Sequence, residues 1–285
     1  MTQSTQTTQT TQTTRHALYV AEILALWALD RIRRRPTDID VKAGPADYVT
    51  DTDREIEQHI RAELNRHFPE HAVNGEEFGD GGSHFTTNAD GVSARPTWFI
   101  DPVDGTTNYA HDLPWHSFSL GLHDAAGPLV AVVADAGRGE IISAARGLGA
   151  RRDGLPIQAS SAIDPTGAVV LTELAATAPW PGQSAFLHRM TRREITMRIM
   201  GSSALSLATV GTGRIAAAAL GGGYGMWDVA AGALIAREAG ARLFAHNGTE
   251  AGPADPPPLG GLLAVAPGIA DALREDLLAA IAAEG

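Results

Sequence analysis

Two aspartates, Asp101 and Asp104, stand three residues apart directly after a short apolar run, residues 98–100. The apolar run predicts the end of a buried strand. Pro102 stiffens the backbone between the two carboxylates, and Gly105-Thr106-Thr107 predicts the first turn of a helix. Paired carboxylates hold a hard cation through oxygen, and the N–H groups at a helix start hold an anion, typically phosphate. A cation site next to an anion site is what metal-assisted phosphate chemistry requires.

Three further acidic residues stand at the edges of predicted elements. Asp53 lies at a helix start, Glu76 in a loop and Asp228 after Trp227. Taken singly, Asp53 or Asp228 could be a charge that complements a helix dipole, worth about 0.3–1 kcal/mol. The Asp-Pro-Val-Asp stretch could likewise be a simple turn. However, an unpaired charge at the end of a buried strand is costly, and a metal ion would remove that cost. The sum of these acids therefore favours a metal site.

Composition excludes several other classes of function. The chain has 285 residues, enough for one large domain or two modest ones, and a formal net charge of −11. Because phosphate contacts need Lys and Arg, we expect no nucleic-acid partner. The absence of cysteine excludes a disulfide framework, a zinc-thiolate site and a cysteine nucleophile. No apolar run reaches the ~18 residues of a membrane span, so we expect no membrane partner.

The first fourteen residues are a Thr/Gln repeat without the basic start and apolar core of a signal peptide. We interpret residues 1–14 as a disordered tail and the protein as cytoplasmic.

Strand and helix patterns alternate through the rest of the chain. A capping box of Thr52 and Glu55 is expected at one helix start, and Gly240 as the C-cap of another. A hairpin turn is expected at Asp153-Gly154, and a mobile loop over residues 79–91. Helices are predicted over residues 15–35, 52–68, 186–193, 203–210, 226–239 and 269–283, and strands over 117–122, 129–134, 140–144, 169–172, 197–200, 242–245 and 262–266. This alternation favours a layered structure of helices and sheets.

Three motifs in a fixed order carry a resemblance to a known family. They are Gly75-Glu76-Glu77, then Asp101-Pro102-Val103-Asp104-Gly105-Thr106, then Trp227-Asp228-Val229-Ala230-Ala231-Gly232. Further matches are Val49-Thr50-Asp51-Thr52-Asp53 with Lys42 before it, residues 149–154, and Arg198 with Gly201-Ser202. From about residue 15 to its end the chain resembles the inositol monophosphatase family of magnesium-dependent, lithium-sensitive phosphatases.

The resemblance implies an α+β fold layered as αβαβα, with an N-terminal metal-binding half over residues 15–158. The C-terminal half, residues 159–285, would cap the substrate. It also implies a homodimer, and a small phosphorylated molecule as the substrate.

Site residues follow from the same resemblance. The ligands of two or three Mg²⁺ ions would be Glu76, Asp101, the backbone carbonyl of Val103, Asp104 and Asp228. Glu76 and Thr106, with Asp53 behind Thr106, would orient and deprotonate the attacking water. Substrate contacts would come from Asp104, Gly105, Thr106, Gly201, Ser202, Ser203 and Asp228, with Lys42, Arg198 and Tyr224 as additional candidates.

The chain departs from the family pattern at the positions that would contact the sugar of the substrate. The family's inositol phosphatases carry a Glu seven residues before the helix Asp, whereas residues 215–227 of this chain contain no acid. Thr172-Glu173-Leu174 is followed by Ala175-Ala176 where the family commonly has Gly-Ser. We therefore expect a different or broader phosphomonoester, such as a less polar sugar-like, cyclitol or nucleoside phosphate. Tyr224 and Trp180 either cover an apolar part of that substrate or belong to ordinary packing.

The sequence is also compatible with other substrates and other functions. The substrate could be inositol-1-phosphate itself, histidinol phosphate or fructose-1,6-bisphosphate. A non-catalytic protein that binds metal or phosphate on the same fold is a further alternative. Residues 211–216, with Glu238 downstream, match a loose dinucleotide-binding fingerprint, which would indicate an NAD-dependent oxidoreductase. The preceding segment, however, predicts a helix rather than the strand which that fingerprint requires.

Overall fold

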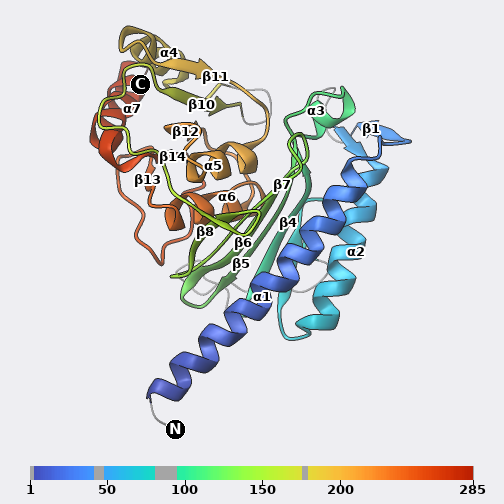
Figure 1. Cartoon of the computed structure of the whole chain (residues 1–285). Coiled ribbons are helices and arrows are strands. Elements are labelled where there is room, and N and C mark those ends of the chain that lie inside the picture. Colours follow the sequence, from blue (N-terminus) through green and yellow to red (C-terminus); the bar gives the residue numbers. More distant parts are fainter. Residues whose placement is uncertain (1–2, 42–47, 81–94, 175–178, 285) are drawn as a thin grey trace.

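Helices and sheets alternate through the molecule in five layers, αβαβα (Figure 1). The computed structural model describes residues 3–41, 48–80, 95–174 and 179–284. Three apolar cores separate the layers within these ranges. The layered α+β fold predicted from the sequence is confirmed.

The first sheet has seven strands in the order β3-β4-β5-β6-β7-β8-β9. Its first pair, β3 and β4, is parallel, and all its other neighbours are antiparallel. The strands are β3 Ala72–Gly75, β4 Thr97–Asp104, β5 Ser117–Asp124, β6 Gly127–Asp135, β7 Glu140–Ala145, β8 Gly149–Arg152 and β9 Leu155–Ile157. The predicted hairpin turn between β8 and β9 is confirmed, because Asp153 and Gly154 both have positive φ, 50° and 79°.

The second sheet has five strands in the order β11-β10-β12-β14-β13. Strands β11, β10 and β12 are parallel, whereas β14 runs antiparallel to both of its neighbours. The strands are β10 Val169–Glu173, β11 Thr196–Arg198, β12 Ala217–Leu220, β13 Arg242–Ala245 and β14 Leu262–Val265. A separate two-stranded ribbon pairs β1 (Ile39–Val41) with β2 (Tyr48–Thr50).

The helices form three layers around these sheets. Helices α1 (Gln3–Ile32) and α2 (Asp51–His67) cover the outer face of the first sheet, and α4 (Gln183–Arg192) and α7 (Ala270–Glu284) cover the outer face of the second. A 3₁₀ turn, Pro267–Ile269, precedes α7, and the short helix α3 spans Thr106–Ala110.

Helices α5 (Ser203–Gly211) and α6 (Met226–Glu238) lie between the two sheets. Every residue of α5 is buried, as expected for a helix packed on all sides. A Cβ on Gly232 of α6 would lie 2.6 Å from the Ala204 carbonyl oxygen. Glycine at this position therefore lets α6 cross close over α5, which brings the starts of the two helices to the same region.

The N-terminal segment differs from its prediction. Helix α1 begins at Gln3, so the Thr/Gln repeat predicted as a disordered tail is helical over residues 3–14. Extending a helix adds a hydrogen bond per residue without a new nucleation cost. The repeat therefore continues the helix that residues 15–32 form against the first sheet (Figure 1).

The cap of α2 also differs from its prediction. The capping box consists of Thr50 and Asp53, not of Thr52 and Glu55. Strand β2 ends at Thr50 and helix α2 begins at the next residue, so the extended Thr50 is the N-cap.

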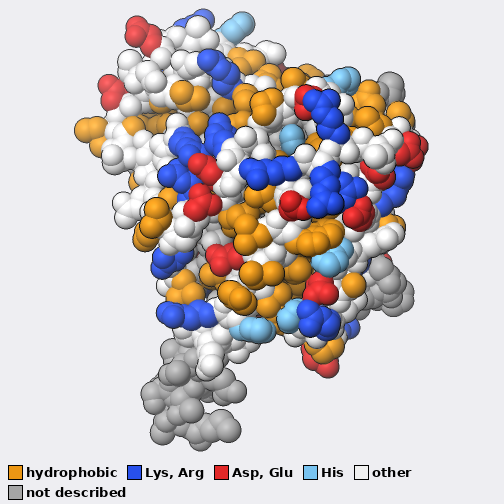
Figure 2. Space-filling model, turned by 45° about the vertical axis from the view of Figure 1, so that its right-hand side comes forward, with side chains coloured by type: hydrophobic (Ala, Val, Ile, Leu, Met, Phe, Trp, Pro, Cys, Tyr) orange, Lys and Arg blue, Asp and Glu red, His pale blue; other side chains and the backbone are white. Residues whose placement is uncertain are grey.

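The face that carries α1 and α2 mixes charged and apolar side chains (Figure 2). Arginines near the end of α1 form exposed ion pairs with acidic residues, such as Arg31 with Glu55 and Arg34 with Asp30. Tyr19, Ile23 and Leu26 are exposed on α1. Among the described residues, no helix combines the length and the apolar character needed to cross a membrane.

Candidate active site

The strand β4 carries both aspartates of the Asp-Pro-Val-Asp stretch. In a regular strand, residues three positions apart point to opposite faces of the sheet. The pairing of β4 with β5 shifts register between Asp101 and Asp104, and such a bulge re-aims a side chain. The irregularity therefore allows both carboxylates to reach one cluster.

The third carboxylate of that cluster comes from α6. Asp228 lies in the first turn of the helix, and its Oδ2 accepts a hydrogen bond from the Gly225 N–H at 2.6 Å. One oxygen each from Asp101, Asp104 and Asp228 lies within 4.8 Å of the others. A strand end of the first sheet and a helix start between the sheets thus converge on one acidic cluster.

Asp101 is the residue of this cluster with unsatisfied oxygens. Its side chain is 1% exposed, and neither Oδ1 nor Oδ2 has a hydrogen-bond partner. Burial, and then the negative charges of Glu76, Asp104 and Asp228, raise the pKa of Asp101 well above its ordinary value. A divalent cation would supply both the missing partner and the missing charge. Clustered carboxylate oxygens are hard ligands and fit Mg²⁺.

Asp104 is held from the start of α5. Its Oδ2 accepts hydrogen bonds from the Ser202 hydroxyl and from the Ala204 N–H, the latter at 2.7 Å. The Ser203 hydroxyl lies 3.5 Å from Oδ1. Burial raises the pKa of Asp104 to about 6, and the hydrogen bonds from Ser202 and Ala204 oppose this rise. Ser202 and Ser203, predicted to contact substrate, thus contact Asp104.

Glu76 reaches the site from the parallel neighbour of β4. Gly75 of β3 pairs with Ile100 of β4, and the Glu76 N–H donates to the Ile100 carbonyl at 3.1 Å. The next residues along the two strands, Glu76 and Asp101, are therefore neighbours. Glu76 lies outside the three-carboxylate cluster, but among the neighbouring charges its effect on the pKa of Asp101 is the largest.

Thr106 begins α3 next to the cluster. Gly105 before it has a φ of 88°, in the left-handed region that favours glycine. The Thr106 hydroxyl donates to the Val103 carbonyl at 2.9 Å. The family resemblance predicts that Asp53 stands behind Thr106.

Asp53 lies in the first turn of α2. Its Oδ2 accepts the Thr50 N–H at 2.8 Å and the Thr50 hydroxyl at 2.6 Å, while its buried Oδ1 has no partner. The capping box of α2 thus engages one carboxylate oxygen, while the Thr106 hydroxyl donates to Val103. The placement of Asp53 behind Thr106 stays a prediction. Burial raises the pKa of Asp53 to about 7, opposed by the Thr50 hydrogen bonds.

The remaining candidates lie at different depths. The Tyr224 hydroxyl is buried without a partner. Burial, followed by the charges of Glu173, Asp104 and Asp228, raises the Tyr224 pKa. Arg198 is exposed, and its guanidinium donates to the Met197 carbonyl. Trp180 is buried in the outer core of the second sheet. Lys42, Ala175-Ala176 and most of the predicted loop over 79–91 lie outside the described residues.

Sequence reasoning missed Glu173, which is buried at the end of β10. It accepts hydrogen bonds from the Gly201 N–H at 2.7 Å and the Ser206 hydroxyl at 2.6 Å. Burial raises its pKa to about 7, and these hydrogen bonds oppose the rise. Glu173 therefore fixes the loop that leads to Ser202. An acid at the end of an apolar strand is the same signal that identified Asp101, and it could have been applied here.

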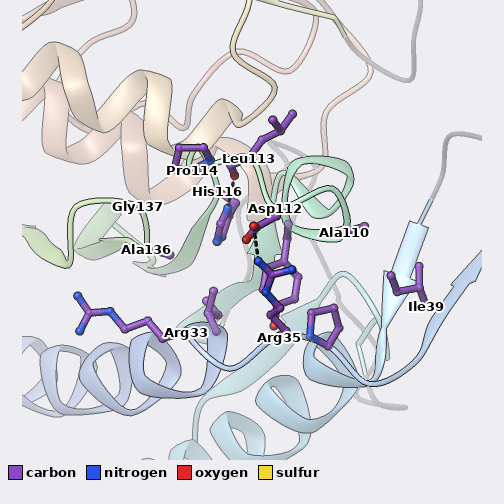
Figure 3. A pocket seen from close by; sticks show the side chains of 13 residues that line it. Arg33, Arg35, Ile39, Ala110, Asp112, Leu113, Pro114, His116, Ala136 and Gly137 are labelled. Atoms are coloured by element: carbon purple, nitrogen blue, oxygen red, sulfur yellow. Dashed lines mark hydrogen bonds and ion pairs between the residues drawn. The ribbon is translucent and has the colours of Figure 1, made fainter.

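A cavity of about 320 Å³ lies beside the C-terminal end of α3. Figure 3 shows Arg35 reaching toward Asp112 there, with which it forms an ion pair. The His116 Nδ1 lies 2.9 Å from the Leu113 carbonyl oxygen. None of the predicted site residues lines this cavity, so we place the chemistry at the acidic cluster instead.

The chain matches known proteins over most of its length. A model of the inositol monophosphatase family matches residues 9–283. The chain belongs to the inositol monophosphatase family. Proteins of this family are phosphatases that hydrolyse phosphate monoesters. The resemblance deduced from the sequence motifs is thus confirmed.

Individual family members are similar over most of their length. Inositol monophosphatase 1 from Solanum lycopersicum is 37% identical over 218 residues, which are 74% of this chain and 76% of that protein. The structure of a Thermotoga maritima inositol monophosphatase superposes with a TM-score of 0.80 at 27% identity, covering 95% of this chain and 100% of that one. An inositol monophosphatase/NADP phosphatase complexed with Mg²⁺ and phosphate shares the fold, with a TM-score of 0.69 at 20% identity over 84% of this chain and 85% of that one.

The dinucleotide-binding alternative is not supported by the fold. Residue 211 ends helix α5, and residues 212–216 lead from it into strand β12. A dinucleotide fingerprint needs the opposite order, a strand followed by a helix whose N-terminus meets the pyrophosphate.

Proposed function

We propose that this chain is a Mg²⁺-dependent phosphomonoesterase that acts on a small phosphorylated molecule at the Asp101, Asp104 and Asp228 cluster. The observation that carries the proposal is the Asp101 carboxylate, buried with both oxygens unpartnered. A protein does not retain such a charge without compensation.

The metal ligands would be Glu76, Asp101, the Val103 carbonyl, Asp104 and Asp228, sharing two or three Mg²⁺ ions. When bound, Mg²⁺ would lower the pKa of water and stabilise the charge that develops on the leaving oxygen. The positions of the described residues support this ligand set. Strand β4 and helix α6 bring three of these carboxylates together, and β3, which pairs with β4, places Glu76 beside Asp101.

The other residues of the site would orient the reactants. The first N–H groups of a helix have no partner within the helix, so those of Gly105 and Thr106 would hold phosphate oxygens. The Thr106 hydroxyl donates to Val103, which leaves its lone pairs to accept a hydrogen bond from the attacking water. Glu76 would accept the proton of that water. Asp53, whose Oδ2 accepts from Thr50 and whose buried Oδ1 has no partner, would stand behind Thr106 in this relay.

The alcohol side of the site favours a substrate other than inositol-1-phosphate. At Gly221, where the family's inositol phosphatases carry an acid, a Cβ would lie 2.6 Å from the Cβ of Trp180. The Trp180 indole, held by a hydrogen bond to the Thr172 hydroxyl at 3.1 Å, occupies the space that a longer side chain would need. A sugar hydroxyl without its partner loses about 1–3 kcal/mol of binding. We therefore propose a less polar sugar-like, cyclitol or nucleoside phosphate.

The decisive experiment measures phosphate release from a panel of phosphomonoesters with Mg²⁺ and with a chelator. The panel contains inositol-1-phosphate, histidinol phosphate, fructose-1,6-bisphosphate, nucleoside phosphates and aminocyclitol phosphates. We expect chelator-sensitive release that Asp104→Asn abolishes. Release from none of these substrates would refute the phosphatase proposal, and a clear preference in kcat/KM for inositol-1-phosphate would refute only the substrate proposal.

Four accompanying properties belong to the same proposal. Lithium should inhibit phosphate release, and the chain should form a homodimer, measurable by sedimentation. We propose that residues 15–158 carry most of the metal ligands and that residues 159–285 add Asp228 and cap the substrate, since the two sheets divide in the same way. A cytoplasmic location is the fourth, and a fluorescent fusion of the full chain would test it.

A further inference from the structure

A buried glutamate of α2 lies beneath the turn that carries Glu76. The Glu57 side chain is completely buried. Its Oε2 accepts the Glu77 N–H at 2.8 Å, and its Oε1 accepts the Phe78 N–H at 3.2 Å. The carboxylate therefore satisfies two consecutive backbone donors directly after Glu76.

Arg61, one helical turn after Glu57, completes the arrangement. Its Nε donates to Glu57 Oε1 at 2.8 Å, which pairs the two charges. Its other nitrogens donate to the Val73 carbonyl at 3.2 Å and to the Gly79 carbonyl. Glu57 and Arg61 together thus bind the N–H groups of the turn and the carbonyls on either side of it.

Gly75 shows that this contact is tight. A Cβ on Gly75 would lie 2.1 Å from Glu57 Oε1 and 2.4 Å from Glu57 Cδ. The φ of Gly75 is not in the left-handed region. Glycine is needed here for space, because the Glu57 carboxylate lies directly against the backbone.

The turn itself closes through the Gly75 N–H, which donates to the Gly79 carbonyl at 2.9 Å. On its other side, the Glu76 N–H is bound to Ile100 of β4. The backbone of Glu76 is therefore held between β4 and the Glu57–Arg61 pair.

We propose that Glu57 and Arg61 are positioning residues that hold the 75–79 turn in the shape that keeps Glu76 next to Asp101, and that they thereby set the Mg²⁺ affinity of the site. This inference rests on the proposed function. Neither residue is a ligand in the proposal, since both Glu57 oxygens are engaged by donors of the chain. Partners that orient metal ligands typically change metal affinity 10- to 100-fold when mutated.

The sharpest variant is Glu57→Gln. Glutamine keeps the volume but replaces one acceptor oxygen by an NH₂ donor, and all the groups around it are donors. Asp276→Asn is the matched control. Asp276 is also buried and also paired with arginines, Arg189 and Arg193, but it joins α7 to α4 in the outermost layer.

Binding of Mg²⁺ alone is measured by calorimetry on the full chain without substrate, together with hydrogen exchange at the Glu77 and Phe78 amides. We expect Glu57→Gln to raise the Mg²⁺ Kd about tenfold or more and to speed exchange at both amides. Asp276→Asn should lower thermal stability and leave the Mg²⁺ Kd within about twofold of the unmodified chain.

The outcomes separate the inference from the proposed function. An unchanged Mg²⁺ Kd in Glu57→Gln, with normal binding by the unmodified chain, overturns the inference and leaves the proposed function standing. An equal rise in Kd in Asp276→Asn also overturns it, because a general loss of stability would then explain both. Failure of the unmodified chain to bind Mg²⁺ overturns both proposals. Should Glu57→Gln not fold, Arg61→Lys provides the same test, because lysine cannot reach Glu57 and both carbonyls at once.

Discussion

Replacing Asp101 by asparagine should stabilise the metal-free protein while abolishing its activity. Asp101 is buried, and neither of its oxygens has a partner. Asparagine has nearly the same shape without the charge, and its NH₂ group could donate to the surrounding carboxylates. The substitution therefore removes an unfavourable buried charge that only a bound cation would compensate.

The magnitude follows from the cost of an uncompensated buried charge. Such a charge costs about 3 kcal/mol, which for a chain of this size is roughly 6 °C in Tm. The direction depends on pH. Because the pKa of Asp101 is raised, the folded state prefers the protonated acid, so the cost appears as pH rises and disappears in acid. The gain should therefore be larger at pH 8 than at pH 5.

Bound Mg²⁺ should remove most of the difference in stability between Asp101→Asn and the unmodified chain. A ligand at about 100 times its Kd stabilises the folded state by about 2.7 kcal/mol, which the unmodified chain gains and Asp101→Asn does not. Thermal unfolding at pH 8, with chelator and then with saturating Mg²⁺, measures both effects. Asp276→Asn serves as the control and should lower Tm by the same amount in both conditions. A metal-free Asp101→Asn that is less stable than the unmodified chain would refute the reasoning.

Three further predictions concern the same region. The pKa of Asp53 rises from 3.8 to about 7 on folding, so the metal-free protein should lose stability as pH rises from about 4 to about 7, by at most roughly 4 kcal/mol at about 1.4 kcal/mol per pKa unit. Urea unfolding across this range tests it, and Asp53→Asn should flatten the profile. Gly75→Ala forces a methyl group against the Glu57 carboxylate beneath the turn and should lower the free energy of unfolding by about 1–3 kcal/mol. Gly260→Ala is the control and should be neutral, because the space around its Cβ is open. Equal losses of Tm in the two variants would contradict this prediction. Gly221→Glu should lower stability and not improve kcat/KM for inositol-1-phosphate, because Trp180 fills the space; improved turnover of that substrate would show that the indole moves aside.

Most elements follow from local sequence patterns. The predicted strands over 117–122, 129–134 and 140–144 lie within β5, β6 and β7, and the predicted helices overlap α2, α4, α5, α6 and α7. In these segments hydrophobic periodicity and turn residues agree with the tertiary environment.

The strand β12 was not predictable in this way. Its sequence is Ala217-Ala218-Ala219-Leu220, and alanine has a weak preference for strands. It is a strand because β10 and β14 pair with it on both sides, and all four of its residues are buried. Only the tertiary structure supplies those neighbours.

The acidic residues themselves were determined by the sequence. An acid directly after an apolar strand, or in the first turn of a helix, is a local feature, and it identified Asp101, Asp104 and Asp228 without coordinates. Their motifs also identified the family. The pattern of residue types thus sufficed for the class of reaction.

What each acid contacts was decided by the tertiary structure. The bulge in β4 lets Asp101 and Asp104 reach Asp228, and the N-cap of α2 engages Asp53. Glu57, farther along α2, supports the turn that carries Glu76. Hydrogen bonds and burial depend on distances between residues far apart in the chain, and no local pattern encodes these distances. For this reason the sequence predicts a cluster of carboxylates, whereas the fold determines which of them is left without a partner.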